Sequence, residues 1–290
     1  MKRVKKMQYE SPKSIDDAIS LISNSPGNVR LLAGGTDLLV QMQSQVADPD
    51  LVIDIKNIKE MKEFKKEDGV YTVGAAVTGM EIIEHEEFGS DWPGVVDGVK
   101  LIGSIQIKGR ASMGGNLCNA SPAADSIPAM IASGASAVIA GPNGRREVLV
   151  EDFIKGPGKT SLKSNEILLS VKFPIKKPNS SGAYLRFTPR TEMDIAVVGV
   201  GINVTMSDSG ICEEAKVSIG AVAEKALVVE DAATALVGNK ITDEIIENFI
   251  SKVRASARPI NDKRGTVDFR IQVIGVIAKR ALKMALERIR

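Results

Sequence analysis

The sequence predicts an α+β fold in two successive parts. Its 290 residues, 43% apolar and 26% charged, are typical of a chain of about two domains with a sizeable core. Short strands and helices mix along the chain up to Pro174, whereas three long extended runs followed by three helices lie beyond it. Strands first and helices after them favour a separate α+β domain in the second part.

The first part begins with a helix and then alternates between strands and helices. Ser14 can cap a helix because its side-chain oxygen accepts a backbone N–H, and two aspartates that suit a first turn follow it. A strand over 30–33 runs into a glycine turn at 34–37 and a helix over 38–42. The β-branched residues of 51–55 predict the next strand.

The remainder of the first part mixes the two element types further. Residues 70–75 predict a strand, and Thr78 is expected to cap the helix that follows it. Residues 137–140 and 146–150 predict a hairpin that is closed by the Pro-Asn-Gly turn at 142–144. Strands and helices are thus mixed throughout the first part.

The second part separates its strands from its helices. The expected extended runs lie at 183–187, 195–206 and 215–223, with a turn at 207–210. The expected helices lie at 231–237, 242–256 and 267–289. Residues 176–182 form the most linker-like heptad of the chain, so we predict the domain boundary there.

Composition excludes several kinds of site. Because 38 basic and 36 acidic side chains leave a formal charge of +2 and aromatic residues make up only 4%, no nucleic-acid partner is expected. One histidine and two cysteines cannot supply the ligands of a zinc or iron–sulfur centre. We therefore expect no metal centre that this chain builds by itself.

The cytoplasm is the predicted location of the chain. Cys118 and Cys212 form no C-x-x-C pair and are interpreted as reduced thiols. The basic residues 1–6 lead into no apolar segment of the kind that a secretory signal needs. The uncharged segment 126–144 is interrupted by prolines and glycines, so no transmembrane segment is expected.

Two glycine-rich turns are candidates for a ligand site, at residues 33–37 (Ala-Gly-Gly-Thr-Asp) and 112–116 (Ser-Met-Gly-Gly-Asn). Paired glycines let backbone N–H groups approach an anion closely, so both turns could hold phosphate. The alternative is that both are tight turns whose glycines only supply positive φ angles. A pyrophosphate held by backbone dipoles is the more specific hypothesis.

Asp125 is the single charged residue in the stretch from 111 to 144. A stretch so poor in charge is either deep core or the wall of a buried ligand. The Asp125 carboxylate accordingly either caps a helix or contacts a ligand hydroxyl or ring N–H. The sequence favours neither alternative over the other.

Three other patterns are rejected as sites. Residues 158–160 (Gly-Lys-Thr) end like a P-loop, but the glycine required five residues earlier is Phe153. Residues 199–204 begin like a dinucleotide fingerprint, yet they lack its third glycine and lie in an extended run. His85, the single imidazole, is interpreted as a solvated helix residue, so no catalytic triad is expected.

Taken together, several of these segments resemble a known family. Residues 31–38 and 107–125 look like the two FAD-binding signatures of the flavoprotein (medium) subunit of molybdenum hydroxylases. That family includes xanthine dehydrogenases, aerobic carbon monoxide dehydrogenases, and nicotinate and quinoline hydroxylases. The resemblance continues, in order and spacing, at residues 156–160, 166–170, 190–196 and 258–265.

The resemblance implies a fold and a division into domains. A vanillyl-alcohol-oxidase (PCMH)-type FAD-binding domain is expected over 1–176, in two subdomains of about 1–57 and 58–176. A domain similar to the carbon monoxide dehydrogenase flavoprotein C-terminal domain is expected over 183–290, with an antiparallel sheet and helices.

The resemblance also implies which residues contact FAD. Those expected around the pyrophosphate are Arg30, Leu31, Leu32, Ala33, Gly34, Gly35, Thr36, Asp37, Leu38, Ala111, Ser112, Met113, Gly114, Gly115 and Asn116. Those expected near the ribityl chain and ring, or elsewhere on the cofactor, are Ile102, Ser121, Pro122, Asp125, Ile167, Leu168 and Arg186. Arg186 stands where the family often has lysine, and Ile102 where some relatives have an aromatic residue. No catalytic or metal-binding residue is expected.

The implied function is that of an oxidoreductase subunit that relays electrons. A chain without a metal ligand set would leave the molybdenum cofactor to a large partner subunit and the [2Fe-2S] clusters to a small one. FAD would pass electrons from those clusters to NAD+ or another acceptor. Two cysteines cannot build the extra cluster of the 4-hydroxybenzoyl-CoA reductase branch.

Two alternatives come from other classes. One is a self-contained FAD-dependent reductase or oxidase of the same fold type, similar to the enolpyruvyl-glucosamine reductases. It would need its own acid or base near the substrate, and the sequence nominates none. The other is a partner-binding protein without catalysis, in which both glycine turns are structural.

Overall fold

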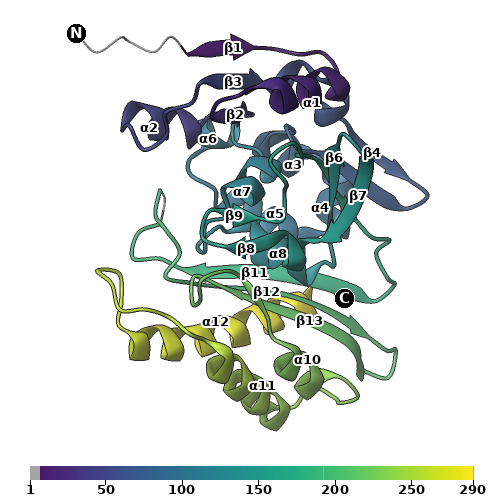
Figure 1. The fold of residues 1–290 in the computed structure, drawn as a ribbon. Helices are drawn as coiled ribbons and strands as arrows, with labels where there is room; N and C mark the ends of the chain where they lie inside the picture. Colours follow the sequence, from purple (N-terminus) through teal and green to yellow (C-terminus); the bar gives the residue numbers. More distant parts are fainter. Residues whose placement is uncertain (1–6, 192, 290) are drawn as a thin grey trace.

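The computed structural model describes residues 7–191 and 193–289, which fold as three layers along one axis (Figure 1). The basic residues 1–6, interpreted above as no secretory signal, and residue 192 of the 190–196 segment lie outside the described residues. A small N-terminal sheet lies at the top of the view, a second sheet with helices at its centre, and a third sheet with three helices at the bottom.

The top layer is a three-stranded parallel sheet in the order β1-β3-β2. Its elements are β1 (Gln8–Glu10), α1 (Ile15–Asn24), β2 (Val29–Leu32), α2 (Leu38–Gln43) and β3 (Leu51–Asp54). The predicted cap is confirmed, because the Ser14 side chain accepts a hydrogen bond from the Asp17 N–H at 3.1 Å. Short 3₁₀ turns, η1 (Ile55–Asn57) and η2 (Lys59–Lys62), lead out of the layer.

The central layer is a five-stranded antiparallel sheet in the order β4-β5-β10-β6-β7. Its strands are β4 (Phe64–Glu67), β5 (Val70–Gly74), β6 (Ser136–Gly141), β7 (Gly144–Leu149) and β10 (Ile167–Phe173). Its helices are α3 (Gly79–Glu84), α4 (Glu86–Asp91), α5 (Pro93–Lys100), α6 (Ile105–Lys108), α7 (Met113–Asn119), α8 (Ser126–Ala132) and α9 (Val150–Phe153). A separate two-stranded antiparallel ribbon is formed by β8 (Ile154–Gly156) and β9 (Lys159–Thr160). The helix capped by Thr78 and the β6–β7 hairpin are confirmed.

The bottom layer is an antiparallel sheet in the order β11-β12-β13-β14. Its elements are β11 (Ser180–Phe187), β12 (Val198–Met206), β13 (Cys212–Gly220), β14 (Leu227–Val228), α10 (Glu230–Leu236), α11 (Asp243–Ser256) and α12 (Val267–Glu287). The three helices cover one face of the sheet, and α5 and α8 of the central layer cover the other (Figure 1). The predicted order of strands before helices is confirmed.

The linker predicted at 176–182 differs from the structure at its end. Ser180, Ser181 and Gly182 already belong to β11, where they pair with residues 203–205 of β12. Serine and glycine suggested a loop, but the ladder hydrogen bonds and the burial of Ser180 and Ser181 override that local preference. The exact domain limits, 1–176 and 183–290, stay a prediction.

The interface between the central and bottom layers is very close. A Cβ added to Gly94 of α5 would lie 2.8 Å from the Ala183 backbone nitrogen, and one added to Gly201 of β12 would overlap the Pro128 carbonyl of α8. Two hydrophobic clusters meet here, and Tyr184 of β11 packs with the cluster of the first domain. We call this glycine-lined contact of α5 and α8 with β11–β13 the seam.

Candidate cofactor-binding site

The two glycine turns predicted from the sequence lie against each other. A Cβ on Gly34 would overlap the carbonyl oxygen of Arg110, so the first turn touches the segment that leads into the second. The Arg110 Nε donates to the Gly34 carbonyl at 3.3 Å. Gly114 in turn packs on the Ala75 backbone, where a Cβ would lie 2.6 Å from the Ala75 Cα. The turns at 33–37 and 112–116 thus form one wall.

This wall presents free backbone donors. Within the described residues, the N–H groups of residues 34–38 donate to no protein acceptor, although Leu39 already bonds the Gly35 carbonyl as α2 begins. Gly35 has a φ of +76°, which lets consecutive N–H groups turn toward the same side. In the second turn, the Ser112 hydroxyl accepts from the Gly115 N–H at 3.0 Å and caps α7. A set of unpaired amides of this kind suits an anion such as a pyrophosphate.

Asp125 does not cap a helix, which was one of the two roles weighed for it from the sequence, and its contact with a ligand stays a prediction. It occupies the position before α8, but its side chain makes no capping hydrogen bond. Its carboxylate instead accepts the Tyr184 hydroxyl at 2.9 Å and the Arg186 Nη1 at 2.5 Å, both from β11 of the other domain. The charge is therefore used to bind the C-terminal domain across the seam.

Arg186 is a buried cation with donors to spare. Its side chain is 5% exposed, and its Nη1 bonds Asp125. Its Nε and Nη2 meet no acceptor in the part of the chain that the structure describes. Neither atom is among the buried polar atoms that lack a partner in the described residues, so both are accessible to solvent and can donate to a polar ligand at this edge of the seam.

Asp125 gives the protein a testable pH dependence. Burial raises the pKa of Asp125 to about 6 from 3.8, although Arg186 and Tyr184 act in the opposite direction. Some carboxyl groups have a higher pKa in the folded than in the unfolded protein. Such a group makes its full contribution to folding stability at pH values below its unfolded-state pKa, and this contribution is lost as the pH rises through its folded-state pKa. Relative to Asp125→Asn, which does not titrate, the free energy of unfolding of the wild type should fall by up to about 3 kcal/mol between pH 3 and pH 7. Urea unfolding of both proteins across this range measures the difference, and a constant difference would contradict it.

The other predicted contacts are distributed around the same region. The Ser121 hydroxyl accepts from the Ala123 N–H at 3.3 Å, and the Pro122 carbonyl accepts from the Ala221 N–H at 2.8 Å. The Asn116 Oδ1 accepts the Ser126 hydroxyl at 2.7 Å, which leaves its amide group as a donor. Ile167 and Leu168 of β10 have buried side chains, and Ile102 is half-buried after α5. Their contacts with FAD stay predictions.

His85 has a different setting from the one predicted for it. It is half-buried rather than solvated, and its ring packs on Phe64 with centroids 4.2 Å apart. Its Nδ1 accepts from the Phe88 N–H at 3.2 Å and so caps α4. His85 therefore caps a helix, and the neighbouring residues in the sequence did not indicate this role.

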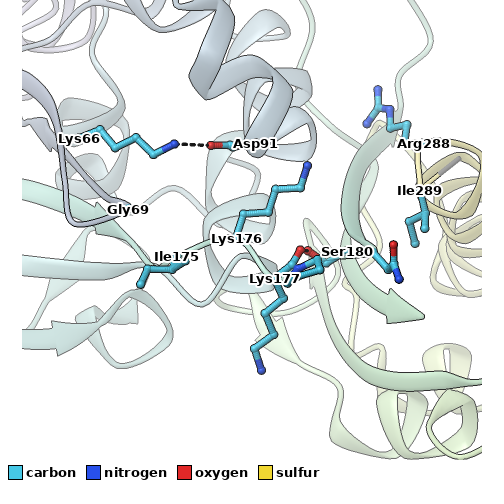
Figure 2. A pocket seen from close by; sticks show the side chains of 11 residues that line it. Lys66, Gly69, Asp91, Ile175, Lys176, Lys177, Ser180, Arg288 and Ile289 are labelled. Atoms are coloured by element: carbon cyan, nitrogen blue, oxygen red, sulfur yellow. Dashed lines mark hydrogen bonds and ion pairs between the residues drawn. The ribbon is translucent and has the colours of Figure 1, made fainter. Parts of the chain in front are cut away.

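A cavity of about 460 Å³ lies away from the glycine turns, where the linker meets the C-terminal end of the chain (Figure 2). Its basic lining is largely neutralised: Lys66 binds Glu87 and Asp91, and Lys177 binds Glu214. Arg288 pairs with Asp97 of α5 at 2.7 Å. Because these carboxylates balance three of the cations and the Lys176 ammonium donates to the Ser90 carbonyl at 3.3 Å, this cavity has little to offer a phosphate, and the glycine turns remain the better anion site.

The described residues contain neither a cluster of metal ligands nor a helix suited to crossing a membrane. Within these residues no three His, Cys, Asp or Glu side chains come together as metal ligands. Among the described helices none combines the length and the apolar character needed to cross a membrane. Cys118 and Cys212 are both free thiols.

Comparison with known proteins gives consistent matches over nearly the whole chain. Residues 5–176 match the family described as FAD binding domain in molybdopterin dehydrogenase, and residues 183–285 match the CO dehydrogenase flavoprotein C-terminal domain. The carbon monoxide dehydrogenase medium chain of Hydrogenophaga pseudoflava is 29% identical and covers 98% of both chains. The xanthine dehydrogenase FAD-binding subunit of Escherichia coli O157:H7 is 29% identical over 96% of this chain and 95% of that one.

Solved structures agree with these relatives. A chain of carbon monoxide dehydrogenase from Hydrogenophaga pseudoflava superimposes with a TM-score of 0.93 at 30% identity, covering 98% of both chains. A chain of quinoline 2-oxidoreductase from Pseudomonas putida 86 gives a TM-score of 0.90 at 26% identity, covering 97% of both chains.

Proposed function

The chain belongs to the FAD-binding subunits of molybdopterin dehydrogenases, and from this premise we propose that it is the electron-relay subunit of a multi-subunit molybdenum hydroxylase. A large partner would hold the molybdenum cofactor, and a small partner would hold [2Fe-2S] clusters. Electrons would leave through FAD to NAD+ or another acceptor. The observation that carries the proposal is the run of backbone N–H groups at residues 34–38, which donate to no acceptor in the described part of the chain and lie against the second glycine turn.

The residues present fit FAD. The N–H groups of 34–38 would hold the pyrophosphate, since this wall offers amides and lacks a carboxylate that bonds them. The free Nε and Nη2 groups of Arg186 would meet a polar edge of the flavin ring. FAD, when bound, supplies the ability to accept electrons singly and to release them as a pair.

The protein's own side chains bind and orient rather than react. Asp125 fixes Arg186 by an ion pair and keeps the local charge balanced when no ligand is present. The seam encloses most of this pair, since the two side chains are 9% and 5% exposed. A guanidinium held in this way is positioned before the cofactor arrives, which lowers the entropic cost of binding.

Affinity purification of the native protein tests the proposal. The expected result is released FAD together with molybdenum, iron and two companion polypeptides. FAD on a solitary chain without metals would overturn the relay function and favour the self-contained flavoenzyme. A chain that takes up no flavin even on reconstitution would overturn both.

The acceptor needs a separate measurement. Once the complex is reduced by its substrate or by dithionite without oxygen, NAD+ is added and NADH formation is followed at its absorbance maximum. Stoichiometric NADH would assign NAD+ as the acceptor. Reoxidation only by an artificial dye would exclude NAD+ and leave another acceptor.

A further inference from the structure

Tyr184 of β11 is held by the first domain at both its ends. Its hydroxyl donates to the Asp125 Oδ1 at 2.9 Å, and its backbone N–H donates to the Asp97 Oδ2 at 3.2 Å. Its ring is buried, with 1% of the residue exposed. Asp97 is itself fixed by Arg288, so neither end of Tyr184 has freedom to move.

The strand next to β11 is shaped around this ring. Gly199 of β12 pairs with Arg186, and a Cβ at Gly199 would overlap the Tyr184 hydroxyl, so the ring lies over this glycine. Gly201, which pairs with Tyr184, leaves the space of its missing side chain to the backbone of Pro128 in α8. The glycines that looked like the start of a dinucleotide fingerprint therefore make room for Tyr184 and for the seam.

Tyr184 and Arg186 act on one carboxylate. They lie two residues apart on the same face of β11, and each bonds a different oxygen of Asp125. The main chain at Asp125 is fixed as well, because a Cβ on Gly98 of α5 would lie 2.7 Å from the Asp125 carbonyl. What remains adjustable is the torsion of the Asp125 side chain, and the Tyr184 hydroxyl determines it.

We propose that Tyr184 is a positioning residue for the cofactor: through Asp125 it sets the direction in which Arg186 presents its free N–H groups to the flavin. This inference rests on the proposed function, since it needs FAD bound within reach of the Arg186 guanidinium. Tyr184 touches neither the cofactor nor the glycine turns in this scheme. Its effect should therefore disappear when Arg186 is gone.

The test compares Tyr184→Phe with a matched control, Tyr71→Phe. Both tyrosines are 1% exposed and both hydroxyls donate to an aspartate, but Tyr71 bonds Asp91 at 2.8 Å, away from the seam. FAD dissociation constants, the visible spectrum of bound FAD and its midpoint potential at saturating FAD are measured for each variant. Thermal unfolding without FAD shows that each variant folds.

Tyr184→Phe should weaken FAD binding about tenfold, shift the flavin absorption band and move the midpoint potential to a more negative value. The potential falls because the Arg186 charge is less well placed to stabilise the reduced flavin. Tyr71→Phe should change the dissociation constant by less than about twofold and leave the spectrum and potential unaltered.

A double-mutant cycle with Arg186→Gln shows whether Tyr184 acts through Arg186. In the Arg186→Gln background, Tyr184→Phe should change FAD affinity by less than about twofold. The inference would be overturned if the two substitutions lowered FAD affinity independently, so that their fold-changes multiplied in the double variant. It would also be overturned if Tyr184→Phe kept the wild-type flavin spectrum and midpoint potential. Failure of the wild type to bind FAD would instead overturn the proposed function, so the two failures are distinguishable.

Discussion

Gly34→Val is expected to abolish FAD retention, with an affinity at least about a hundredfold lower than that of the wild type. A side chain at Gly34 has no space, because even a Cβ would overlap the Arg110 carbonyl. The first glycine turn must then separate from the second, and the amides of 34–38 lose their common direction. The FAD content of the purified variant and its affinity on reconstitution measure the effect.

Gly109→Ala is the matched control for this change. Gly109 lies in the same contact region, at the end of α6, but has a φ of −65°, and a Cβ there would meet its nearest neighbour at an ordinary 3.6 Å. It should therefore bind FAD within about twofold of the wild type. If Gly34→Val does not fold, Gly35→Ala takes its place in the test. Alanine at position 35 strains a φ of +76° without touching the Arg110 backbone. Normal FAD occupancy in a folded variant at either position would contradict the assignment of the pyrophosphate site.

Asp125→Ala should lower the free energy of unfolding by about 3–5 kcal/mol at pH 7, because it leaves the buried Arg186 charge without its partner. The Tyr184 hydroxyl loses its acceptor at the same time. Both losses fall on the seam, so the contact between the two domains weakens directly. Urea unfolding monitored by circular dichroism gives the change.

Glu214→Ala controls for the loss of a carboxylate as such. Glu214 pairs with Lys177 at 2.5 Å, and both side chains are 57% exposed, so solvent screens this ion pair. The expected loss is below about 1 kcal/mol. If Asp125→Ala costs no more than Glu214→Ala, the interpretation of the seam as a buried polar contact is wrong.

Local signals in the sequence were enough for helix starts and for the hairpin. Ser14 and Thr78 both cap helices, and Thr78 forms a complete capping box with Glu81. The turn at 142–144 joins β6 to β7 as expected. These features depend on residues within a few positions of each other, which is why a single sequence can predict them.

Elements shaped by distant contacts were missed. The helix α5 contains two glycines, which disfavour helix formation, but Gly94 and Gly98 are needed for its approach to β11 and to Asp125. The strand β10 is buried on both faces, so it lacks the alternation that reveals a strand. Tertiary packing decided both elements, and its partners lie far away in the sequence.

The candidate site likewise combines features that the sequence predicted with features that it did not. The glycine turns were predicted because their composition is distinctive and their resemblance to a family is continuous. The partners of Asp125 were not, since Tyr184 lies 59 residues away and no local pattern links the two. A buried aspartate in a neutral stretch does signal that a donor must exist, but the fold alone selects which donor it is.

The glycine-lined seam has a consequence for how this chain can change by recombination. Because α5, α8, β11 and β12 meet backbone to backbone, a foreign C-terminal half with alanine at position 201 would collide with the Pro128 carbonyl. Chimeras between relatives should therefore survive only when the crossover carries the matching small residues from both parents. The two halves are therefore expected to be compatible only as a matched pair. Calorimetry of the intact chain should show both domains unfolding in a single cooperative transition.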